Sequence, residues 1–467
     1  MLFTEFNFIV FFIPVFIFTW LLKKNNHRIL FLVFSSFIFY GMWDWKFTSL
    51  LFLIILVSYF IPLLVLKHKK YRKKILILGI IIDLAVLGFF KYFNFFIESC
   101  MEFSILCGVK ANLSTLNIIL PVGISFYIFQ SISYMVDIYR RPEYIDRSFL
   151  NVALYISFFP QLVAGPVVRS QEFLPQIYKL PKFREIPFKY CGFLFLAGFF
   201  KKTILADNIS YIIDPVFLNY QNYTGADLLF SSVGYFIQIY CDFSGYTDMA
   251  IACSLLLGYK LPKNFDFPYF SRNISIFWSR WHMSLSSWLK DYLYIPLGGN
   301  RNGVILQYKN LLITMGLGGL WHGASWNFII WGLLHGLALV IHKIILNSRF
   351  RNLFPGAKNI LNMLSITFTM LFVLIMWVFF RASTLQDAIS IIQNISYKNS
   401  LTILNSYLAI SLVICVVVLH YLGYKKFWRR LGNILPNWLL SIVYGVAWAL
   451  MFPFAREGYQ AFIYFQF

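Results

Sequence analysis

Long apolar runs alternate with short basic segments along most of this chain. In its first third, predominantly apolar runs cover residues 6–22, 29–43, 47–66, 75–95 and 116–136. A helix needs about 20 such residues to cross a bilayer, so the run 29–43 is short and is expected to tilt or to thin the bilayer locally. The pattern predicts a series of membrane-spanning helices.

The run at 149–165 is predicted to enter the membrane and return on the same side. Basic residues flank it at both ends, and Pro160, Gly165 and Pro166 interrupt it. Broken backbone at membrane depth is tolerated only where it is buried in protein or lines a wet cavity. Further apolar segments cover residues 190–205, 228–258, 309–323, 325–346, 359–380, 401–422 and 437–455.

These segments predict an all-α polytopic membrane protein with about 11 transmembrane helices plus re-entrant pieces. No linker, internal repeat or low-complexity tract divides the sequence, so residues 1–467 are expected to form a single membrane domain. Composition supports this class, because 59% of the residues are hydrophobic and only 13% are charged. A soluble globular protein carries about 25% charged residues. This chain has too few charged residues to cover a water-facing surface of its size.

The formal charge of +21 does not indicate a nucleic-acid-binding protein. The basic residues gather in short loops such as 23–28, 67–74 and 137–147, which all fall on one side when the crossings are counted. Such loops are typical of the cytoplasmic face of a membrane protein. No zinc-ligand spacing or RNA-binding motif accompanies them, and the first apolar run precedes its positive charges, unlike a cleavable signal peptide.

An amphipathic pattern covers residues 277–291, within the polar and aromatic stretch 259–308. Polar side chains recur there at helical spacing, and large apolar ones lie one step round the helix. The pattern predicts a helix lying in the cytoplasmic membrane interface. It would place His282 at the membrane surface.

His322 is the most informative single residue, since it lies between Trp321 and Trp326 in an apolar region. An ionisable side chain at membrane depth is a functional hypothesis by default, and histidine exchanges protons near neutral pH. His335 lies in the same apolar region as His322. If one helix covered both histidines, their side chains would point in roughly opposite directions, about 20 Å apart along the axis. A packing role is then at least as well supported for His335.

Several long motifs occur in order along the chain and together resemble the membrane-bound O-acyltransferase superfamily, in particular its bacterial branch of alginate O-acetylation membrane proteins. The core of the resemblance covers about residues 120–336, and Trp377–Ala382 extends it. The motifs are PVGISFY at 121–127, FFPQLVAGP at 158–166, CDFSGYTD at 241–248, RWHMSLS at 280–286, YLYIPLGGN at 292–300 and WHGA at 321–324.

This resemblance implies a helical barrel around a tunnel through the bilayer, with the acyl donor entering from the cytoplasm. His322 would match the family's catalytic histidine at the middle of the tunnel, and His282 a second conserved polar position on the cytoplasmic side. The branch implies a bacterial cytoplasmic (inner) membrane location, acetyl-CoA as donor, and an extracytoplasmic SGNH-type acetyltransferase as partner. The final acceptor would be a polysaccharide such as alginate or peptidoglycan.

The residues are chemically compatible with acyl transfer. A desolvated imidazole at His322 would stay neutral and could accept the proton of an attacking hydroxyl. A thioester is already activated, so neither a metal nor a redox cofactor is expected. Trp321 and Trp326 could exclude water from the reaction, and Asn327 is a further candidate for lining the tunnel.

Three charged residues have open interpretations. Asp242 and Asp248 could orient a histidine, pair with a buried base or line the tunnel, or they could belong to an interfacial loop. Arg280 could hold the phosphates of the donor or serve as an interfacial anchor.

Two other functions remain open from the sequence. One is D-alanyl transfer to teichoic acid from a carrier protein, a related activity within the same superfamily. The other is a non-enzymatic transporter of glycan or lipid, which would also be polytopic and basic. A transporter is typically built from repeated halves, and the sequence contains no such repeat.

Overall fold

The computed structural model describes residues 2–109, 113–347, 358–396, 400–402, 406–451 and 453. Within these ranges all regular structure is helical and no strand occurs. The chain forms two compact units. The first contains Met1–Cys191 and Ala250–Pro262, and the second contains Gly192–Met249 and Lys263–Phe467. The expectation of a single domain therefore stays a prediction.

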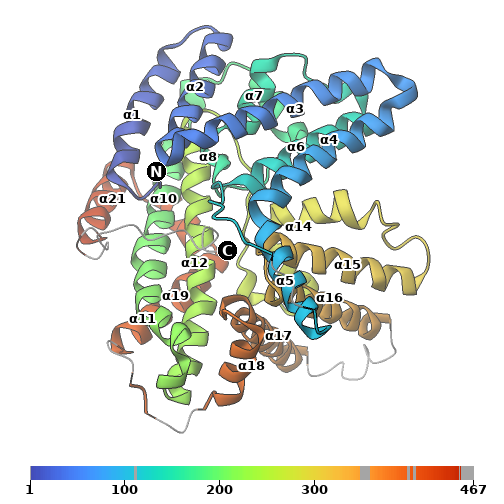
Figure 1. Cartoon of the computed structure of the whole chain (residues 1–467). Coiled ribbons are helices and arrows are strands. Elements are labelled where there is room, and N and C mark those ends of the chain that lie inside the picture. The colour runs from blue at the N-terminus through green and yellow to red at the C-terminus, as the bar shows by residue number, and fades with distance from the viewer. Residues whose placement is uncertain are drawn as a thin grey trace. The chain divides into compact units, whose positions relative to one another are not determined.

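The helices of the first unit follow the apolar runs closely. Its helices are α1 (Phe6–Leu21), α2 (Asn25–Asp44), α3 (Thr48–Lys67), α4 (Arg72–Leu87), α5 (Phe93–Leu106), α6 (Ile124–Arg140), α7 (Phe149–Ser157), α8 (Phe159–Leu162) and α9 (Ser170–Ile177). A π-helical turn at Gly88–Tyr92 joins α4 to α5. Helices α3, α4 and α6 contact one another (Figure 1).

One predicted boundary differs, because α6 begins at Ile124 and not near residue 116. Gly123 precedes the helix with a φ of 75°, a left-handed conformation that glycine adopts without a steric penalty. A Cβ atom at this position would also lie 2.4 Å from the carbonyl oxygen of Leu162. The helix therefore starts where the backbone of Gly123 packs directly against the end of α8.

The interruption predicted within 149–165 is present. Helix α7 ends at Ser157, and the short helix α8 starts at Phe159 with Pro160 in its first turn. The whole stretch from Asn151 to Val168 is buried in protein. This is the environment that broken backbone requires at membrane depth; the return of the chain to the same side of the membrane stays a prediction.

The second unit holds the remaining helices. Helices α10 (Phe188–Phe199) and α12 (Gly225–Leu256) each belong partly to both units. The others are α11 (Asp207–Leu218), α13 (Ile274–Arg280), α14 (Met283–Leu289), α15 (Val304–His322), α16 (Trp326–Asn347), α17 (Lys358–Arg381), α18 (Leu385–Asn394), α19 (Ser406–Tyr424), α20 (Phe427–Ile434) and α21 (Asn437–Met451). A π-helix at Phe200–Ala206 connects α10 to α11.

Helices α15 and α16 form a tightly packed hairpin (Figure 1). A Cβ atom at Gly319 would lie 2.0 Å from the carbonyl oxygen of Phe328, and one at Gly332 would lie 2.2 Å from that of Met315. Only glycine fits at these two positions, so the backbones of the two helices touch. Small residues allow this kind of close approach in membrane helices.

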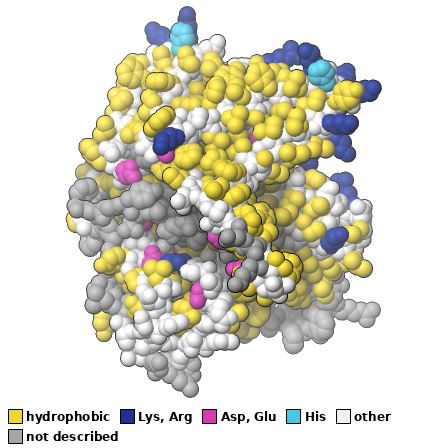
Figure 2. Space-filling model, in the orientation of Figure 1, with side chains coloured by type: hydrophobic (Ala, Val, Ile, Leu, Met, Phe, Trp, Pro, Cys, Tyr) yellow, Lys and Arg dark blue, Asp and Glu magenta, His cyan; other side chains and the backbone are white. Residues whose placement is uncertain are grey.

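The surface agrees with a membrane environment. Among the described residues, four helical segments are long and apolar enough to cross a membrane: Asn25–Lys67, Lys69–Leu106, Trp326–Leu346 and Asn362–Arg381. Three shorter apolar helices cover Phe6–Leu21, Ile410–Tyr424 and Asn437–Met451. Figure 2 shows hydrophobic side chains over much of the visible face, with Lys and Arg in separate clusters. The polytopic architecture is confirmed; the count of about 11 crossings and the tunnel stay predictions.

Candidate active site

His322 is the last residue of α15, and its side chain is only 3% exposed. The helix ends here because Gly323 is extended, and a Cβ atom on Gly323 would lie 2.1 Å from the ring of Phe328. Aromatic rings surround the imidazole. The ring centroids of Trp321, Trp331 and Phe380 lie 5.0, 5.2 and 5.4 Å from that of His322.

His282 lies at a sharp break between α13 and α14. Its backbone φ is 44°, in the left-handed region that is uncommon for residues other than glycine. The continuous interfacial helix predicted for 277–291 is therefore wrong, and so is the surface position of His282, whose side chain is 0% exposed. The reversal at Trp281–His282 turns both side chains into the core, which a straight amphipathic helix could not do.

The two histidines lie together in the second unit. The centroids of their imidazole rings are 6.4 Å apart. Trp321 packs against both, 5.9 Å from His282, and Phe243 covers His282 at 4.7 Å. Burial lowers the pKa of His282 to about 3, because desolvation disfavours the charged imidazolium. The ring is therefore neutral at physiological pH and can accept a proton or a hydrogen bond.

Asn264 holds His282 from the loop before α13. The side-chain oxygen of Asn264 lies 3.2 Å from Nδ1 of His282. The same oxygen accepts hydrogen bonds from the backbone N–H of Ser284 at 3.2 Å and from its hydroxyl at 2.9 Å. The sequence pattern does not single out Asn264, since a lone asparagine in a polar loop carries no motif of its own.

The position of His335 relative to His322 also differs from the expectation for a single helix. His322 and His335 do not share one helix, because α15 ends at His322 and α16 starts at Trp326. Both imidazoles pack on the ring of Trp331, with centroids 5.2 and 4.7 Å away. The separation expected for a single helix covering both histidines therefore does not apply. Trp331 contacts both histidines, and the contacts of His335 with Trp278 and Phe372 at 5.1 and 5.3 Å agree with a packing role.

The remaining predicted residues occupy different positions. Trp326 is 53% exposed at the start of α16. Trp331, in the same helix, packs on His322 together with Trp321. Asn327 is buried and donates a hydrogen bond from Nδ2 to the carbonyl oxygen of Ala382 at 2.9 Å, which ties α16 to the end of α17. Arg280 is partly exposed at the end of α13.

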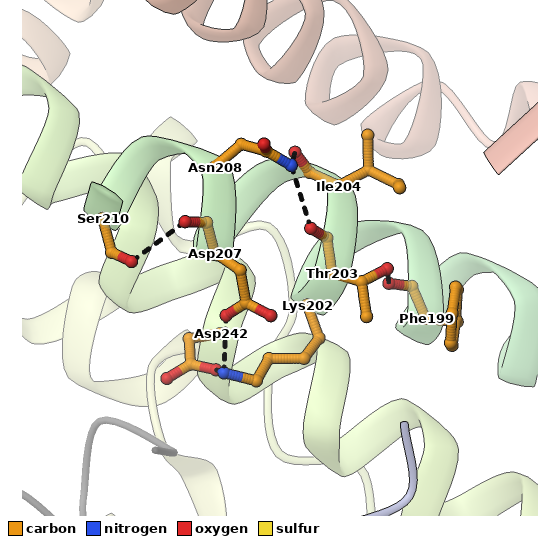
Figure 3. A network of polar contacts seen from close by, with 8 residues as sticks. All are labelled: Phe199, Lys202, Thr203, Ile204, Asp207, Asn208, Ser210 and Asp242. Atoms are coloured by element: carbon orange, nitrogen blue, oxygen red, sulfur yellow. Dashed lines mark hydrogen bonds and ion pairs between the residues drawn. The ribbon is translucent and has the colours of Figure 1, made fainter. Parts of the chain in front are cut away.

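Asp242 and Asp248 both pair with lysines, and for Asp242 the partner is a buried base, which is one of the open interpretations. Nζ of Lys202 lies 2.8 Å from Asp242 and 2.7 Å from Asp207, and Figure 3 shows this buried network between α11 and α12. Lys201 pairs with Asp248 in a partly exposed position. Both lysines lie in the π-helix at Phe200–Ala206. Two adjacent lysines inside an apolar run are the signal for this network, because charge at membrane depth is costly unless it is paired.

Comparison with known proteins identifies the family. The sequence profile of the MBOAT, or membrane-bound O-acyltransferase, family matches residues 19–385. The chain belongs to this family. It is therefore a multi-pass membrane protein and an acyltransferase. The matched region contains His282, His322, Asn264 and both lysine pairs.

Three individual relatives show the degree of similarity within this family. The chain is 36% identical to a probable alginate O-acetylase AlgI of Pseudomonas putida, over the full length of both proteins. It is 38% identical to a peptidoglycan O-acetyltransferase of Helicobacter pylori, with 80% of this chain and 75% of the relative covered. A teichoic acid D-alanyltransferase of Streptococcus thermophilus is 29% identical, with 49% of this chain and 58% of the relative covered.

Proposed function

We propose that this protein moves an acetyl group from a cytoplasmic donor across the membrane for the O-acetylation of a secreted or cell-envelope polysaccharide. The observation that carries the proposal is the pair of buried imidazoles at His282 and His322, 6.4 Å apart and surrounded by aromatic rings. Relatives named as alginate and peptidoglycan O-acetyltransferases support the acetyl group and the class of acceptor.

The chemistry follows from the two rings. A hydroxyl oxygen attacks the carbonyl carbon of an acetyl thioester while the neutral imidazole of His322 takes the hydroxyl proton. The carbon–sulfur bond then breaks, and the proton passes to the departing thiolate. The products are an acetyl ester and a free thiol. Before this step His282, whose ring lies 6.4 Å from that of His322, can orient the hydroxyl by accepting its hydrogen bond, and the same proton then goes to His322.

The aromatic surroundings favour transfer over hydrolysis. Trp321, Trp331 and Phe380 surround His322. Because these rings leave little room for bulk water, an acetyl group held here is protected from attack by water. In a dry site each hydrogen bond to a developing charge is also stronger than in solution.

The donor in this proposal is acetyl-CoA, bound as a substrate from the cytoplasmic side. Arg280 is proposed to contact its phosphates, because guanidinium groups bind phosphate with paired hydrogen bonds. The acetyl group is passed to an extracytoplasmic partner of the SGNH type, which delivers it to the polymer. The proposed location is the bacterial inner membrane.

D-Alanyl transfer from a carrier protein is the second candidate. The similarity to a teichoic acid D-alanyltransferase covers 49% of this chain, whereas the similarity to the alginate O-acetylase covers all of it. This difference favours the acetyl group. Membership of an acyltransferase family speaks against a non-enzymatic transporter.

Transfer of radiolabelled acetyl from acetyl-CoA into envelope polysaccharide tests the proposal. Membranes containing the wild-type chain should incorporate label, and membranes containing His322→Ala should not. His68→Ala is the matched control, because His68 lies exposed in a basic loop. Equal incorporation by wild type and His322→Ala would show that His322 has no catalytic part. Incorporation of labelled D-alanine from a D-alanyl carrier protein, supplied in a parallel assay in place of acetyl-CoA, would support the second candidate.

A further inference from the structure

We infer that Asn264 is a positioning residue that fixes the orientation and the tautomer of His282, so that Nε2 of that ring is the hydrogen-bond acceptor in the site. The inference rests on the proposed function, because it assigns a role to a residue that acts through His282. Three hydrogen bonds to one side-chain oxygen, and the backbone contacts of the same loop, carry the argument.

The first step is the orientation of the Asn264 amide. Its side-chain oxygen faces the backbone N–H of Ser284 at 3.2 Å. A backbone N–H is only a donor, so an acceptor must face it. The reversed amide would place an NH2 group against that N–H. Asn264 therefore presents its oxygen, not its nitrogen, to Ser284 and to His282.

The second step is the tautomer. The oxygen that faces Ser284 also lies 3.2 Å from Nδ1 of His282. An amide oxygen can only accept a hydrogen bond, so Nδ1 must carry the proton. In a neutral imidazole the other nitrogen then carries the acceptor lone pair. Because burial keeps this ring neutral, Nε2 is the atom that can accept a proton or a hydrogen bond.

The third step is rigidity. The backbone carbonyl of Asn264 accepts a hydrogen bond from the N–H of Met283 at 2.9 Å, and the N–H of Asp266 donates to the carbonyl of Arg280 at 3.0 Å. The loop that carries Asn264 is thus tied on both sides of the break at His282. Asn264 itself is 1% exposed. The His282 side chain is 0% exposed, so its neighbours enclose it.

Two substitutions at Asn264 should affect these hydrogen bonds in different ways. The carboxylate introduced by Asn264→Asp would keep an oxygen for all three donors but would add a negative charge beside the ring. The leucine side chain introduced by Asn264→Leu has a similar shape and no acceptor. Among the neighbours of His282 described above, His322 is the other titratable side chain, and it is unchanged in every variant compared.

The experiment measures the pH profile and the steady-state constants of acetyl transfer for Asn264→Asp, Asn264→Leu and the control Asn310→Leu. Asn310 is also buried in the second unit, but its amide bonds to the carbonyl of Gly299 and not to a histidine. In Asn264→Leu we expect kcat to fall by about tenfold or more with little change in KM for the donor. Asn264→Asp should keep most of the wild-type kcat. The acid limb of its pH–rate profile should lie about one pH unit or more above that of the wild type, because the added negative charge stabilises the imidazolium of His282.

Two patterns separate failure of this inference from failure of the proposed function. Full activity in His282→Ala would overturn the role of His282 and, with it, that of Asn264. Loss of activity in His282→Ala together with a wild-type kcat in Asn264→Leu and an unshifted profile in Asn264→Asp would overturn the inference alone. Detergent-extracted yield of each variant, measured by size-exclusion chromatography, distinguishes a catalytic loss from loss of folded protein.

Discussion

His282 and His322 face each other across a ring-to-ring distance of 6.4 Å, although 40 residues separate them in the chain. Helix α14, a loop and the whole of α15 lie between them in sequence. The side chains converge because α13 and α14 break at His282 and α15 ends at His322. The break at His282 and the turn at residues 323–325 after His322 thus bring the two side chains together.

The first prediction concerns coupling between the two histidines. Each single alanine variant should lower kcat for acetyl transfer by about 10²–10⁴-fold, the usual contribution of a positioned acid or base. The double variant should lose little beyond the more severe single variant, because groups that act as a unit are not additive. Steady-state rates of all four proteins in one membrane preparation provide the measurement. Multiplicative losses in the double variant would mean that the two rings act independently.

The helices that carry this site can be predicted from the sequence more accurately than the geometry of the site. Apolar runs locate α15 and α16 within a few residues, and His322 stands out as an ionisable group in such a run. The boundary between the apolar segments 309–323 and 325–346 predicts where α15 ends, but it does not predict the close hairpin, because the glycines near His322 suit a packed helix as well as a break. The break at His282 has no local signal at all, since RWHMSLS reads as continuous amphipathic helix. The tertiary hydrogen bonds at this break are ones that Asn264 accepts from Met283, Ser284 and His282.

The second prediction concerns the contact between α15 and α16. A Cβ atom at Gly319 would lie 2.0 Å from a backbone carbonyl oxygen, so Gly319→Ala must push the two helices apart. Overpacking of this kind costs about 1–3 kcal/mol, and it should lower the thermal midpoint and move His322. Gly445→Ala is the control, because nothing lies within 4 Å of a Cβ at Gly445. Thermal unfolding followed by size-exclusion chromatography compares the two, and equal midpoints would contradict the close helix contact.

The third prediction concerns the buried network in Figure 3. Lys202→Met removes the positive charge between Asp207 and Asp242, each within 2.8 Å of Nζ. Two carboxylates would then face each other in the core, so the folded protein should lose about 3–5 kcal/mol. Lys201→Met should cost much less, because the Lys201–Asp248 pair is partly exposed. Adding Asp242→Asn to Lys202→Met should recover part of the thermal midpoint, and no recovery would argue that Lys202 acts by packing alone.

The lysine network also illustrates what the sequence can reveal. Asp242 and Asp248 are recognisable as costly charges, and pairing with a buried base is one of their open interpretations. Their partners are not recognisable by spacing, because the π-helix at Phe200–Ala206 and α12 are separate elements and the contact depends on how they pack. The π-helix at Phe200–Ala206 adds to the difficulty, since it changes the direction of Lys201 and Lys202 relative to a regular helix.

The fourth prediction concerns stability at low pH. The pKa of His282 is lowered to about 3 in the folded protein, whereas an unfolded histidine titrates near 6.5. Between these values the unfolded state binds one more proton than the folded state at this residue, so stability falls as the pH drops below about 6.5. The slope from this one group is about 1.4 kcal/mol per pH unit.

His282→Gln is the variant that isolates this contribution, because glutamine keeps a polar side chain but does not titrate. Its thermal midpoint should fall less steeply than that of the wild type between about pH 6.5 and 5, the range in which the unfolded histidine takes up its proton. Other histidines contribute equally to both proteins and cancel in the comparison. Parallel curves for the two proteins would mean that His282 is already solvated in the folded state, which would also remove the basis for a neutral ring in the site.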